Sequence, residues 1–369
     1  MAAAKPSGGP LNSGLAAGGG FRYRLHAILC LVKASPREGR VNKIKALVLS
    51  AVAAAVGYFV LQNFDIAGLE SLKLNPKGTQ PVSNTSADPR SFAPPVQRTG
   101  DTIRIATFNI QVFGETKAQD PQVMDILARI VRNFDVVAIQ EIRARNQDVV
   151  PYFVEQINAA GRRYDYVIGE RLGRSHSKEQ YAFIFDTQSL EVDRQQLYTV
   201  ADPDDLLHRE PYVALFRVRG PPPDQAFTFT LINIHTDPDE VPQELNVLDD
   251  VYLAVRNDGR QEDDIILLGD LNTDDRRLGD LGRLSGLVPV VSGMPTNTRG
   301  TAQYDNILFT EQATREFTGR GGVFDFMREY NLTMEQAEKV SDHLPVWAEF
   351  SIYEGGQAGR FAGREPDVK

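Results

Sequence analysis

From residue 101 onward, short apolar runs alternate with segments in which apolar residues recur at helical spacing. The run at 265–268 contains four consecutive aliphatic residues, which is typical of a strand buried on both faces. The pattern predicts strands at 103–108, 136–139, 164–168, 181–185, 190–197, 212–218, 227–234, 265–268, 304–309 and 344–350, and helices at 120–133, 147–159 and 242–257. This mixture of strand–helix units and hairpins predicts an α/β fold with two packed mixed sheets.

The first hundred residues follow a different pattern. Residues 1–45 begin with Ala, Gly and Ser, become basic, and are expected to be largely disordered. Residues 46–64 are uncharged and apolar, and their length is close to the roughly 20 residues that span a bilayer. Because basic residues precede them, we expect a transmembrane anchor with the folded domain on the extracytoplasmic side. A cleavable signal peptide is the alternative, since the alanines at 53–55 suit a peptidase, and the protein would then be secreted.

Two further boundaries complete the predicted organisation. Residues 65–100 are rich in Pro, Ser, Asn and Thr and predict an extended linker. Residues 101–352 then have the length of one large folded domain. The stretch 353–369 is charged and rich in Gly, which predicts a disordered tail.

Charge and cysteine content narrow the possible functions. The formal net charge of the chain is −9, but the first 100 residues carry 12 Lys and Arg against 4 Asp and Glu. The remaining residues therefore hold 28 basic and 45 acidic side chains, which argues against loose, charge-driven binding of nucleic acid. The single cysteine, Cys30, precedes the folded domain, so the sequence excludes an intrachain disulfide and a cysteine-ligated zinc site.

Polar side chains follow many of the predicted strands at the point where the strand ends. They are Asn109, Glu141, His235, Asp270 with Asn272, Asp305, and Asp342 with His343. Any one of them, such as Asp270, is also compatible with a simple turn. Ligands of open sheets bind outside strand ends, hard oxygen ligands suit Mg²⁺, Mn²⁺ or Ca²⁺, and histidines supply acids and bases near neutral pH. The set therefore predicts a metal-assisted phosphoryl-transfer site.

Ordered motifs connect the chain to a known family. Their sequences are Thr-Phe-Asn-Ile at 107–110, Phe-Gly-Glu-Thr-Lys at 113–117, Ile-Gln-Glu-Ile-Arg at 139–143, Leu-Gly-Arg at 172–174, Lys-Glu-Gln-Tyr at 178–181, Arg-Glu-Pro at 209–211, His235, Gly-Asp-Leu-Asn at 269–272, Tyr-Asp at 304–305 and Ser-Asp-His at 341–343. In this order the chain resembles the endonuclease/exonuclease/phosphatase superfamily, and within it the deoxyribonuclease I-like proteins. The resemblance covers about residues 101–352.

The resemblance implies a fold and a set of roles. The fold would be a four-layer sandwich, with two central sheets and helices outside. The divalent metal, Mg²⁺ or Mn²⁺, would be held by Glu141, Asn109, Asp270 and Asp342. The acid and base would be His235, oriented by Glu179, and His343, oriented by Asp305. The side chain of Asn272 would hydrogen-bond the scissile phosphate, and attack by water would leave a 5′-phosphate.

The substrate is the finer question, because relatives of this kind act on DNA, abasic sites, sphingomyelin and inositol phosphates. Arg143, Arg174 and Arg209 match arginines that contact DNA in deoxyribonuclease I-like proteins. One position departs from that pattern, because Ser177 stands where a groove-contacting tyrosine is expected. The departure puts the affinity for duplex DNA in question.

Structural calcium is also implied by the resemblance. Asp202, Asp204, Asp205 and Glu210 cluster in a short segment before the strand at 212–218. Carboxylates so close repel one another unless solvated or bound to a cation, and we expect Asp202, Asp205 and Glu210 to hold Ca²⁺. An exposed acidic loop without an ion is the alternative.

The sequence thus predicts a metal-dependent DNA endonuclease that is exported, tethered to a membrane and monomeric, with no protein partner inferable. Its closest alternative is a phosphodiesterase or phosphatase of the same fold acting on a lipid or another small phosphodiester. A second alternative is a tethered binding module without catalytic activity. The completeness of the set of catalytic side chains favours an enzyme.

Overall fold

The computed structural model describes residues 100–174 and 178–356. Within them the strands form two mixed sheets. The six-stranded sheet has the order β12 (Phe317–Val323), β13 (Val346–Ser351), β1 (Thr102–Phe113), β2 (Val136–Ile142), β4 (Gln180–Asp186) and β3 (Tyr164–Ile168). The seven-stranded sheet has the order β10 (Leu287–Pro289), β11 (Asp305–Thr310), β9 (Ile265–Asp270), β8 (Thr228–His235), β7 (Tyr212–Val218) and β5 (Leu190–Val192), and β6 (Tyr198–Thr199) pairs with β7.

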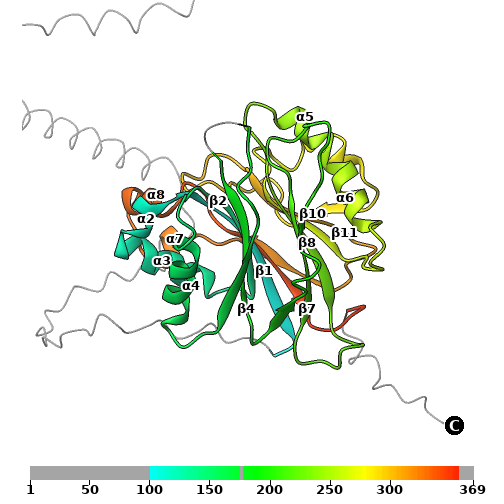
Figure 1. The fold of residues 1–369 in the computed structure, drawn as a ribbon, viewed down its shortest axis with the longest axis horizontal. Coiled ribbons are helices and arrows are strands. Elements are labelled where there is room, and N and C mark those ends of the chain that lie inside the picture. The colour runs from blue at the N-terminus through cyan, green and yellow to red at the C-terminus, as the bar shows by residue number, and fades with distance from the viewer. Residues whose placement is uncertain (1–99, 175–177, 357–369) are drawn as a thin grey trace, which may run out of the picture. The chain divides into compact units, whose positions relative to one another are not determined.

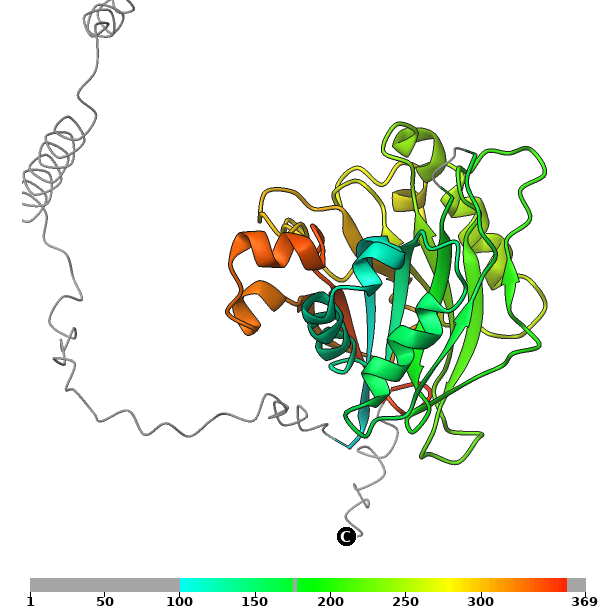
Figure 2. The same ribbon diagram turned by 60° about the vertical axis from the view of Figure 1, so that its left-hand side comes forward.

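The two sheets pack face to face, and helices cover their outer faces (Figure 1). Those beside the six-stranded sheet are α2 (Glu115–Ala118), α3 (Pro121–Val131), α4 (Val149–Asn158), α7 (Phe326–Glu329) and α8 (Met334–Val340). Those beside the seven-stranded sheet are α5 (Val241–Leu245), α6 (Leu248–Arg256) and the short 3₁₀ helix η2 (Leu281–Arg283). Figure 2 shows the same four layers from a second side, and they confirm the predicted two-sheet α/β architecture.

Three apolar clusters hold the layers together. One fills the space between α3, α4 and the six-stranded sheet, a second lies between the sheets, and a third joins the seven-stranded sheet to α6. Aromatic rings dominate the second cluster, where Phe183 of β4 and Phe216 of β7 meet edge to face at 5.7 Å between centroids. Because burial of apolar area is the main favourable term in folding, this central cluster fixes the two sheets against each other.

A small polar network also crosses between the sheets. Gln140 of β2 donates from Nε2 to Oδ1 of Asn233 of β8 at 2.7 Å, and to Oγ1 of Thr107 of β1 at 3.0 Å. All three residues are fully buried. Buried amides are costly unless they are hydrogen-bonded, so this network favours one registration of the two sheets.

Several predicted elements differ from the observed ones. The strand expected at 190–197 ends at Val192, because Asp193 starts a turn in which its carboxylate accepts from the amide of Gln195 at 2.9 Å. The helix expected at 242–257 is divided into α5 and α6 at Asn246, whose side chain accepts from the amide of Asp280 at 2.9 Å. The strand β12 was not expected, because three of its seven residues are glycine.

The predicted terminal segments lie largely outside the described residues. This applies to the basic segment, the anchor, most of the linker, the tail from residue 357, and Ser177. Neither residues 100–174 nor residues 178–356 contain a helix whose length and apolar character would suffice to cross a bilayer. Next to the predicted domain boundary at 352, Tyr353 forms an isolated bridge with Ala226.

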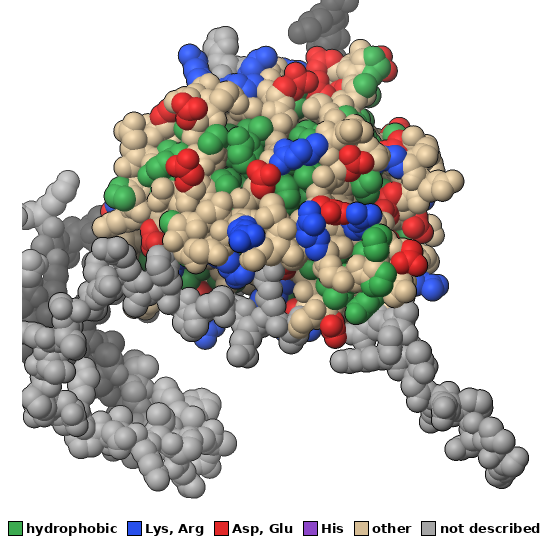
Figure 3. All heavy atoms as spheres, turned by 60° about the horizontal axis from the view of Figure 1, so that its bottom comes forward, with side chains coloured by type: hydrophobic (Ala, Val, Ile, Leu, Met, Phe, Trp, Pro, Cys, Tyr) green, Lys and Arg blue, Asp and Glu red, His purple; other side chains and the backbone are tan. Residues whose placement is uncertain are grey.

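Charges of both signs are interspersed on the surface of the domain. Figure 3 views the end at which the described chain begins and finishes, and shows acidic and basic side chains next to one another there. Exposed carboxylates on this end therefore do not stand apart as a single-sign patch.

Candidate active site

The pairing of three neighbouring strands brings the first site residues together. β8 runs parallel to β9 and pairs His235 with Asp270, whereas β11 runs antiparallel to β9 and pairs Asp305 with the same Asp270. Each of these residues is at most 5% exposed. Residues that are 35 positions apart along the chain thus become neighbours because they occupy equivalent positions on adjacent strands.

The six-stranded sheet contributes the opposite side of the site. Asn109 near the end of β1 donates from Nδ2 to Oδ2 of Asp270 at 3.0 Å and to Oε1 of Glu141 at 3.3 Å. The pairing of β1 with β2 is irregular between Asn109 and Phe113, and Glu141 takes a φ of 60° there. Such an irregularity redirects a side chain, and here it turns the Glu141 carboxylate toward the end of β1.

Gly269 is required by the close approach of two strands. Its φ is 155°, and a Cβ atom built on it would lie 1.9 Å from the carbonyl oxygen of Ile234 in β8. No side chain fits at that distance. The glycine lets β8 and β9 approach each other directly below the Asp270 carboxylate.

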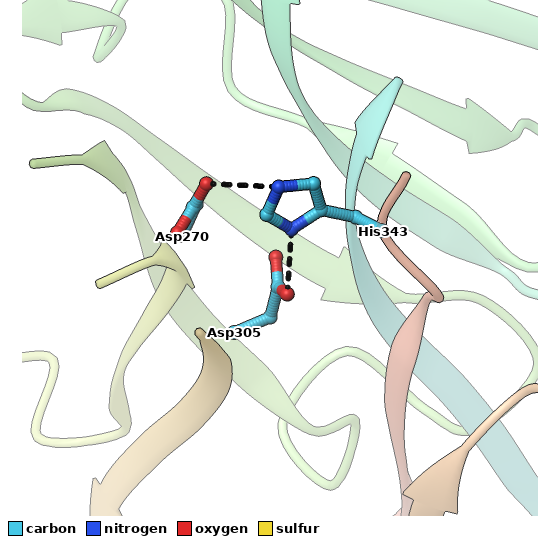
Figure 4. Close-up of side chains that lie close together, drawn as sticks. All are labelled: Asp270, Asp305 and His343. Atoms are coloured by element: carbon cyan, nitrogen blue, oxygen red, sulfur yellow. Dashed lines mark hydrogen bonds and ion pairs between the residues drawn. The ribbon is translucent and has the colours of Figure 1, made fainter. Parts of the chain in front are cut away.

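Each site histidine has a buried carboxylate behind it. His235 Nδ1 lies 2.7 Å from Oε1 of Glu179, and His343 Nδ1 lies 2.9 Å from Oδ2 of Asp305. The Nε2 atoms of the two rings both approach Oδ2 of Asp270, at 3.5 Å and 3.6 Å. Figure 4 shows His343 lying between Asp270 and Asp305 in this way. The structure thus brings together the two histidine–carboxylate pairs that the sequence predicts.

The charges around the imidazoles determine their protonation. Burial lowers the pKa of His235, but the carboxylates of Glu179 and Asp270 outweigh that effect, and the net pKa is raised. The same balance raises the pKa of His343 well above its ordinary value, through Asp305 and Asp270. For Asp270, burial opposes ionisation, but the two histidines prevail and lower its pKa. Asp270 therefore presents an ionised carboxylate at neutral pH.

Asn272 and Asp342 lie at the edge of this arrangement. The backbone amide of Asn272 donates to Oδ1 of Asp270 at 2.9 Å, and its side-chain amide donates to the carbonyl oxygen of Thr236 at 2.9 Å. The Asp342 side chain is 51% exposed, and its Oδ1 lies 3.9 Å from Nε2 of His343. Both residues adjoin the site, and Asp342 is the more accessible to solvent.

The three arginines predicted to contact DNA have different surroundings. Arg143 is 30% exposed, and its guanidinium lies 3.1 Å from Oε2 of Glu141 and 3.8 Å from Oε2 of Glu179. Arg174, 31% exposed, forms ion pairs with Asp205 at 3.0 Å and Glu240 at 2.7 Å. Arg143 is therefore adjacent to Glu141 and to the carboxylate behind His235, whereas Arg174 is held by two carboxylates.

Arg209 does not lie where the expected contact with DNA would place it. Its side chain is only 5% exposed; it lies 3.4 Å from Oε1 of Glu179 and donates to the carbonyl oxygen of His235 at 3.0 Å. A guanidinium enclosed in this way cannot reach the phosphate backbone of a duplex without leaving its partners. Its place in the structure is to support Glu179 and His235 from behind.

The predicted calcium loop also differs from expectation. Among the described residues, the carboxylates of Asp202, Asp205 and Glu210 do not form a group whose oxygens converge within 4.8 Å. Oδ2 of Asp202 accepts from the amide of Leu207 at 2.7 Å, and Asp205 pairs with Arg174. The carboxylates of Asp202 and Asp205 are thus engaged with a backbone amide and with an arginine, respectively.

Three further residues support the site and were not assigned a role from the sequence. Nζ of Lys117 donates to the carbonyl oxygen of Ile110 at 2.8 Å and to that of Val340 at 3.0 Å. Burial lowers the pKa of Lys117 to about 8. Oγ1 of Thr296 donates to Oδ2 of Asp305 at 2.7 Å. Oγ of Ser341 donates to the carbonyl oxygen of Asn109 at 2.7 Å, which ties the His343 loop to β1. In the sequence, only the position of Lys117 and Ser341 within the motifs at 113–117 and 341–343 indicated that these two residues belong near the site.

The donor set is suited to a divalent cation. Oxygens from Asp270 and Asp305 and a nitrogen of His343 converge within 4.8 Å, and Glu141 is linked to Asp270 through the amide of Asn109. Oδ1 of Asp305 is buried without a hydrogen-bond partner. Hard carboxylate oxygens of this kind fit a divalent cation, so the residues present agree with a divalent-metal site.

Comparison with known proteins connects this geometry to a family. Residues 106–343, well over half of the chain, match the model of the endonuclease/exonuclease/phosphatase family. The chain belongs to this family. Deoxyribonuclease gamma of Rattus norvegicus is 32% identical in an alignment of 262 residues that covers 66% of this chain and 83% of that protein. Deoxyribonuclease-1-like 1 of Cricetulus griseus is 33% identical over 263 residues, covering 68% of this chain and 84% of that protein.

Among solved structures, an endonuclease/exonuclease/phosphatase family protein from Bacteroides thetaiotaomicron has a TM-score of 0.46 at 16% identity, and the match covers 68% of this chain and 98% of that one. Membership in the endonuclease/exonuclease/phosphatase family and the curated deoxyribonuclease relatives identify this chain as a deoxyribonuclease I-like hydrolase of phosphodiester bonds. The resemblance predicted from the ordered motifs is confirmed.

Proposed function

We propose that this chain is a divalent-metal-dependent endonuclease that cleaves DNA and leaves 5′-phosphate ends. The observation that carries the proposal is the convergence of two buried histidine–carboxylate pairs on Asp270, with Nε2 distances of 3.5 Å and 3.6 Å. Support for DNA as the substrate comes from the relatives, which are named deoxyribonucleases.

The pairs define the acid and base chemistry. Because Glu179 and Asp305 engage the Nδ1 atoms, they fix the tautomers so that both Nε2 atoms face the site. One imidazole takes a proton from the attacking water, and the other gives a proton to the 3′-oxygen that leaves phosphorus. The bond from phosphorus to the 3′-oxygen breaks, and the phosphate remains on the 5′ side.

Neighbouring residues would hold the metal and the phosphate. Asn109, Glu141, Asp270 and Asp342 are proposed as the metal ligands, and a carboxylate oxygen of Asp305 lies within 4.8 Å of one of Asp270. The bound cation would neutralise negative charge that develops on the phosphate. The side-chain nitrogen of Asn272, Nδ2, carries two hydrogens. One is donated to the carbonyl oxygen of Thr236, so the other is available to a phosphate oxygen.

Arg143 is the side chain that best discriminates between substrates. It is the partly exposed arginine beside both Glu141 and Glu179, where a minor groove would pass over the catalytic residues. The engagement of Arg174 by Asp205 and Glu240, and the burial of Arg209, favour the second candidate function. That candidate is hydrolysis of a lipid or another small phosphodiester at the same site.

Nicking of supercoiled plasmid by the full-length protein, in Mg²⁺ and Ca²⁺ together, tests both candidates. We expect nicking that disappears with EDTA and in Asp270→Ala. Arg143→Ala should lower plasmid nicking about 10-fold or more while hydrolysis of a small aryl phosphodiester is nearly unchanged, and Arg145→Ala, an exposed neighbour, should affect neither. Equal losses on both substrates in Arg143→Ala would contradict a role in DNA binding. Metal-dependent hydrolysis of the small substrate without nicking would establish the second candidate.

We also propose that the domain acts outside the cytoplasm while tethered to a membrane. The support is the uncharged stretch at 46–64 with a basic flank before it. Fractionation of cells that express the full chain should place it in the membrane fraction, accessible to protease from the extracytoplasmic side. Recovery of a shortened, soluble form would instead indicate cleavage of a signal peptide.

A further inference from the structure

A second group of carboxylates lies at the other end of the strands that carry the catalytic residues. Asp264 immediately precedes β9, Glu316 immediately precedes β12, and Glu354 follows β13. One oxygen from each of the three lies within 4.8 Å of the others. Because Asp270 ends the same strand that Asp264 precedes, the two groups are separated by six residues of extended chain, or about 20 Å.

These carboxylates come from both sheets. β9 belongs to the seven-stranded sheet, whereas β12 and β13 belong to the six-stranded sheet. Backbone contacts hold each residue in place: the carbonyl of Asp264 accepts from the amide of Thr230 at 2.9 Å, and that of Glu316 accepts from the amide of Ser351 at 2.7 Å. The carboxylate of Glu354 accepts from the amide of Thr228 at 3.1 Å. The group therefore spans the junction of the two sheets.

Two members of the group are buried, and each has one carboxylate oxygen without a hydrogen-bond partner, whereas Oε1 of Glu316 accepts from the backbone amide of Gly355. Asp264 and Glu316 are each 1% exposed. Oδ1 of Asp264 and Oε2 of Glu316 are inaccessible to solvent and have no hydrogen-bond partner, and neither has Oγ1 of the adjacent buried Thr314. No lysine, arginine or histidine within residues 100–174 and 178–356 forms an ion pair with Asp264, Glu316 or Glu354.

Charges in this position require compensation. Burial raises the pKa of Asp264, and Glu316 and Glu354 raise it further; burial likewise raises the pKa of Glu316 and Glu354. Three carboxylates so close, two of them out of water, are costly unless protons or a cation neutralise them. The exposed charges at this end of the domain are mixed in sign (Figure 3), so what sets this group apart is its burial.

We propose that Asp264, Glu316 and Glu354 hold a Ca²⁺ ion that joins the two sheets at the end of the domain opposite the catalytic residues. Ca²⁺ takes six to eight oxygen ligands in a flexible geometry, which suits carboxylates from three separate segments with a threonine hydroxyl beside them. Mg²⁺ usually keeps several waters, and two largely enclosed carboxylates leave little room for them. Glu354 is exposed and gives the ion a route of entry.

Thermal unfolding of the full-length protein at pH 8, with CaCl₂ or with EDTA, tests the proposal. We expect Ca²⁺ to raise the melting temperature by on the order of 5 °C at a concentration about 100 times the Kd. The rise should persist in Asp270→Ala, which disables the catalytic site, and should be lost in Glu316→Gln. Glu311→Gln is the matched control, because Glu311 is an exposed glutamate in the turn just before Glu316. Plasmid nicking in Mg²⁺ alone should be unchanged in Glu316→Gln.

Titration calorimetry with CaCl₂ gives an independent readout. In the Asp270→Ala background, Glu316→Gln should bind one Ca²⁺ ion fewer than Glu311→Gln. If Glu316→Gln does not fold, Glu354→Gln replaces it, because that side chain is exposed. The same Ca²⁺-dependent rise in Glu316→Gln and Glu311→Gln would overturn the proposal. So would a native protein whose melting temperature does not respond to Ca²⁺, which would mean that protons alone neutralise the group.

Discussion

Replacing Glu179 with Gln removes the negative charge on which three side chains converge. Glu179 is 1% exposed, and its carboxylate lies 2.7 Å from His235 Nδ1, 3.4 Å from Arg209 Nε and 3.8 Å from Arg143 Nε. The substitution keeps the size of the side chain. It leaves the buried Arg209, 6% exposed, without the Glu179 carboxylate. It also lets an amide donate to Nδ1 and reverse the tautomer of His235.

The size of the effect follows from these distances. At an effective dielectric constant of about 20, unit charges 2.7 Å apart attract by about 6 kcal/mol, and the cost of desolvation offsets much of that. Breaking a buried ion pair by removing one partner costs about 3–5 kcal/mol, and we expect a loss of unfolding free energy in that range. Loss of the carboxylate behind a catalytic histidine lowers kcat by about 10²–10⁴-fold, which is the fall in nicking rate that we expect.

The pH dependence gives a second, sharper readout. Burial lowers the pKa of His235, and Glu179 is the largest influence that raises it, so Glu179→Gln should lower this pKa. The limb of the pH–rate profile that belongs to His235 should therefore move to lower pH. Because the folded pKa of His235 is raised, its contribution to stability is complete below about pH 6.5 and is lost as pH rises through the folded pKa.

Initial rates of plasmid nicking between pH 5 and 9 and urea unfolding in EDTA measure these effects. Glu170→Gln is the matched control, since Glu170 is an exposed glutamate in the same connection between β3 and β4. Native-like rates together with an unshifted pH profile in a folded Glu179→Gln protein would refute the reasoning. A loss of stability alone, with the rate per folded molecule unchanged, would leave Glu179 as a structural residue only.

Two further substitutions test the physical account of the fold. Gly269→Ala should lower the free energy of unfolding by at least about 3 kcal/mol and abolish nicking, because its Cβ would lie 1.9 Å from the carbonyl oxygen of Ile234. Gly293→Ala is the control and should keep nicking, because nothing lies within 4 Å of a Cβ atom built there. Thermal unfolding compares the stability of the two variants. Burial raises the pKa of Glu244 from 4.5 to about 7, so stability should fall as pH rises across that interval, and Glu244→Gln should remove the slope and stabilise by about 2–3 kcal/mol at pH 8. Urea unfolding at pH 4.5 and 8 measures this change of stability with pH. An equal change in the native protein and in Glu244→Gln would contradict the prediction.

The sequence by itself located the central strands and the candidate side chains. Apolar runs located β1, β2, β8, β9 and β11, because burial on both faces requires continuous aliphatic segments. It also located the polar residues at their ends, such as Asp270 after Gly269. These are local properties, in which a few consecutive residues contain all the information. The absence of an apolar pattern in the glycine-rich β12 is the reason that this strand was missed.

Only the tertiary structure decided which of these side chains meet. His235, Asp270 and Asp305 become neighbours through the pairing of three strands, and a register slip of one residue would separate them. The sequence does not show whether an arginine is buried. Arg209 was therefore expected to contact DNA, whereas in the structure it lies behind Glu179.

The group of Asp264, Glu316 and Glu354 shows the same limit most clearly. Its members come from three separate stretches of the chain, and none belongs to a recognisable motif. Their proximity depends on how two sheets pack and where each strand starts, and both are set by the apolar core between the sheets. The local sequence thus specifies the chemistry of each side chain, whereas long-range packing specifies the distances at which that chemistry operates.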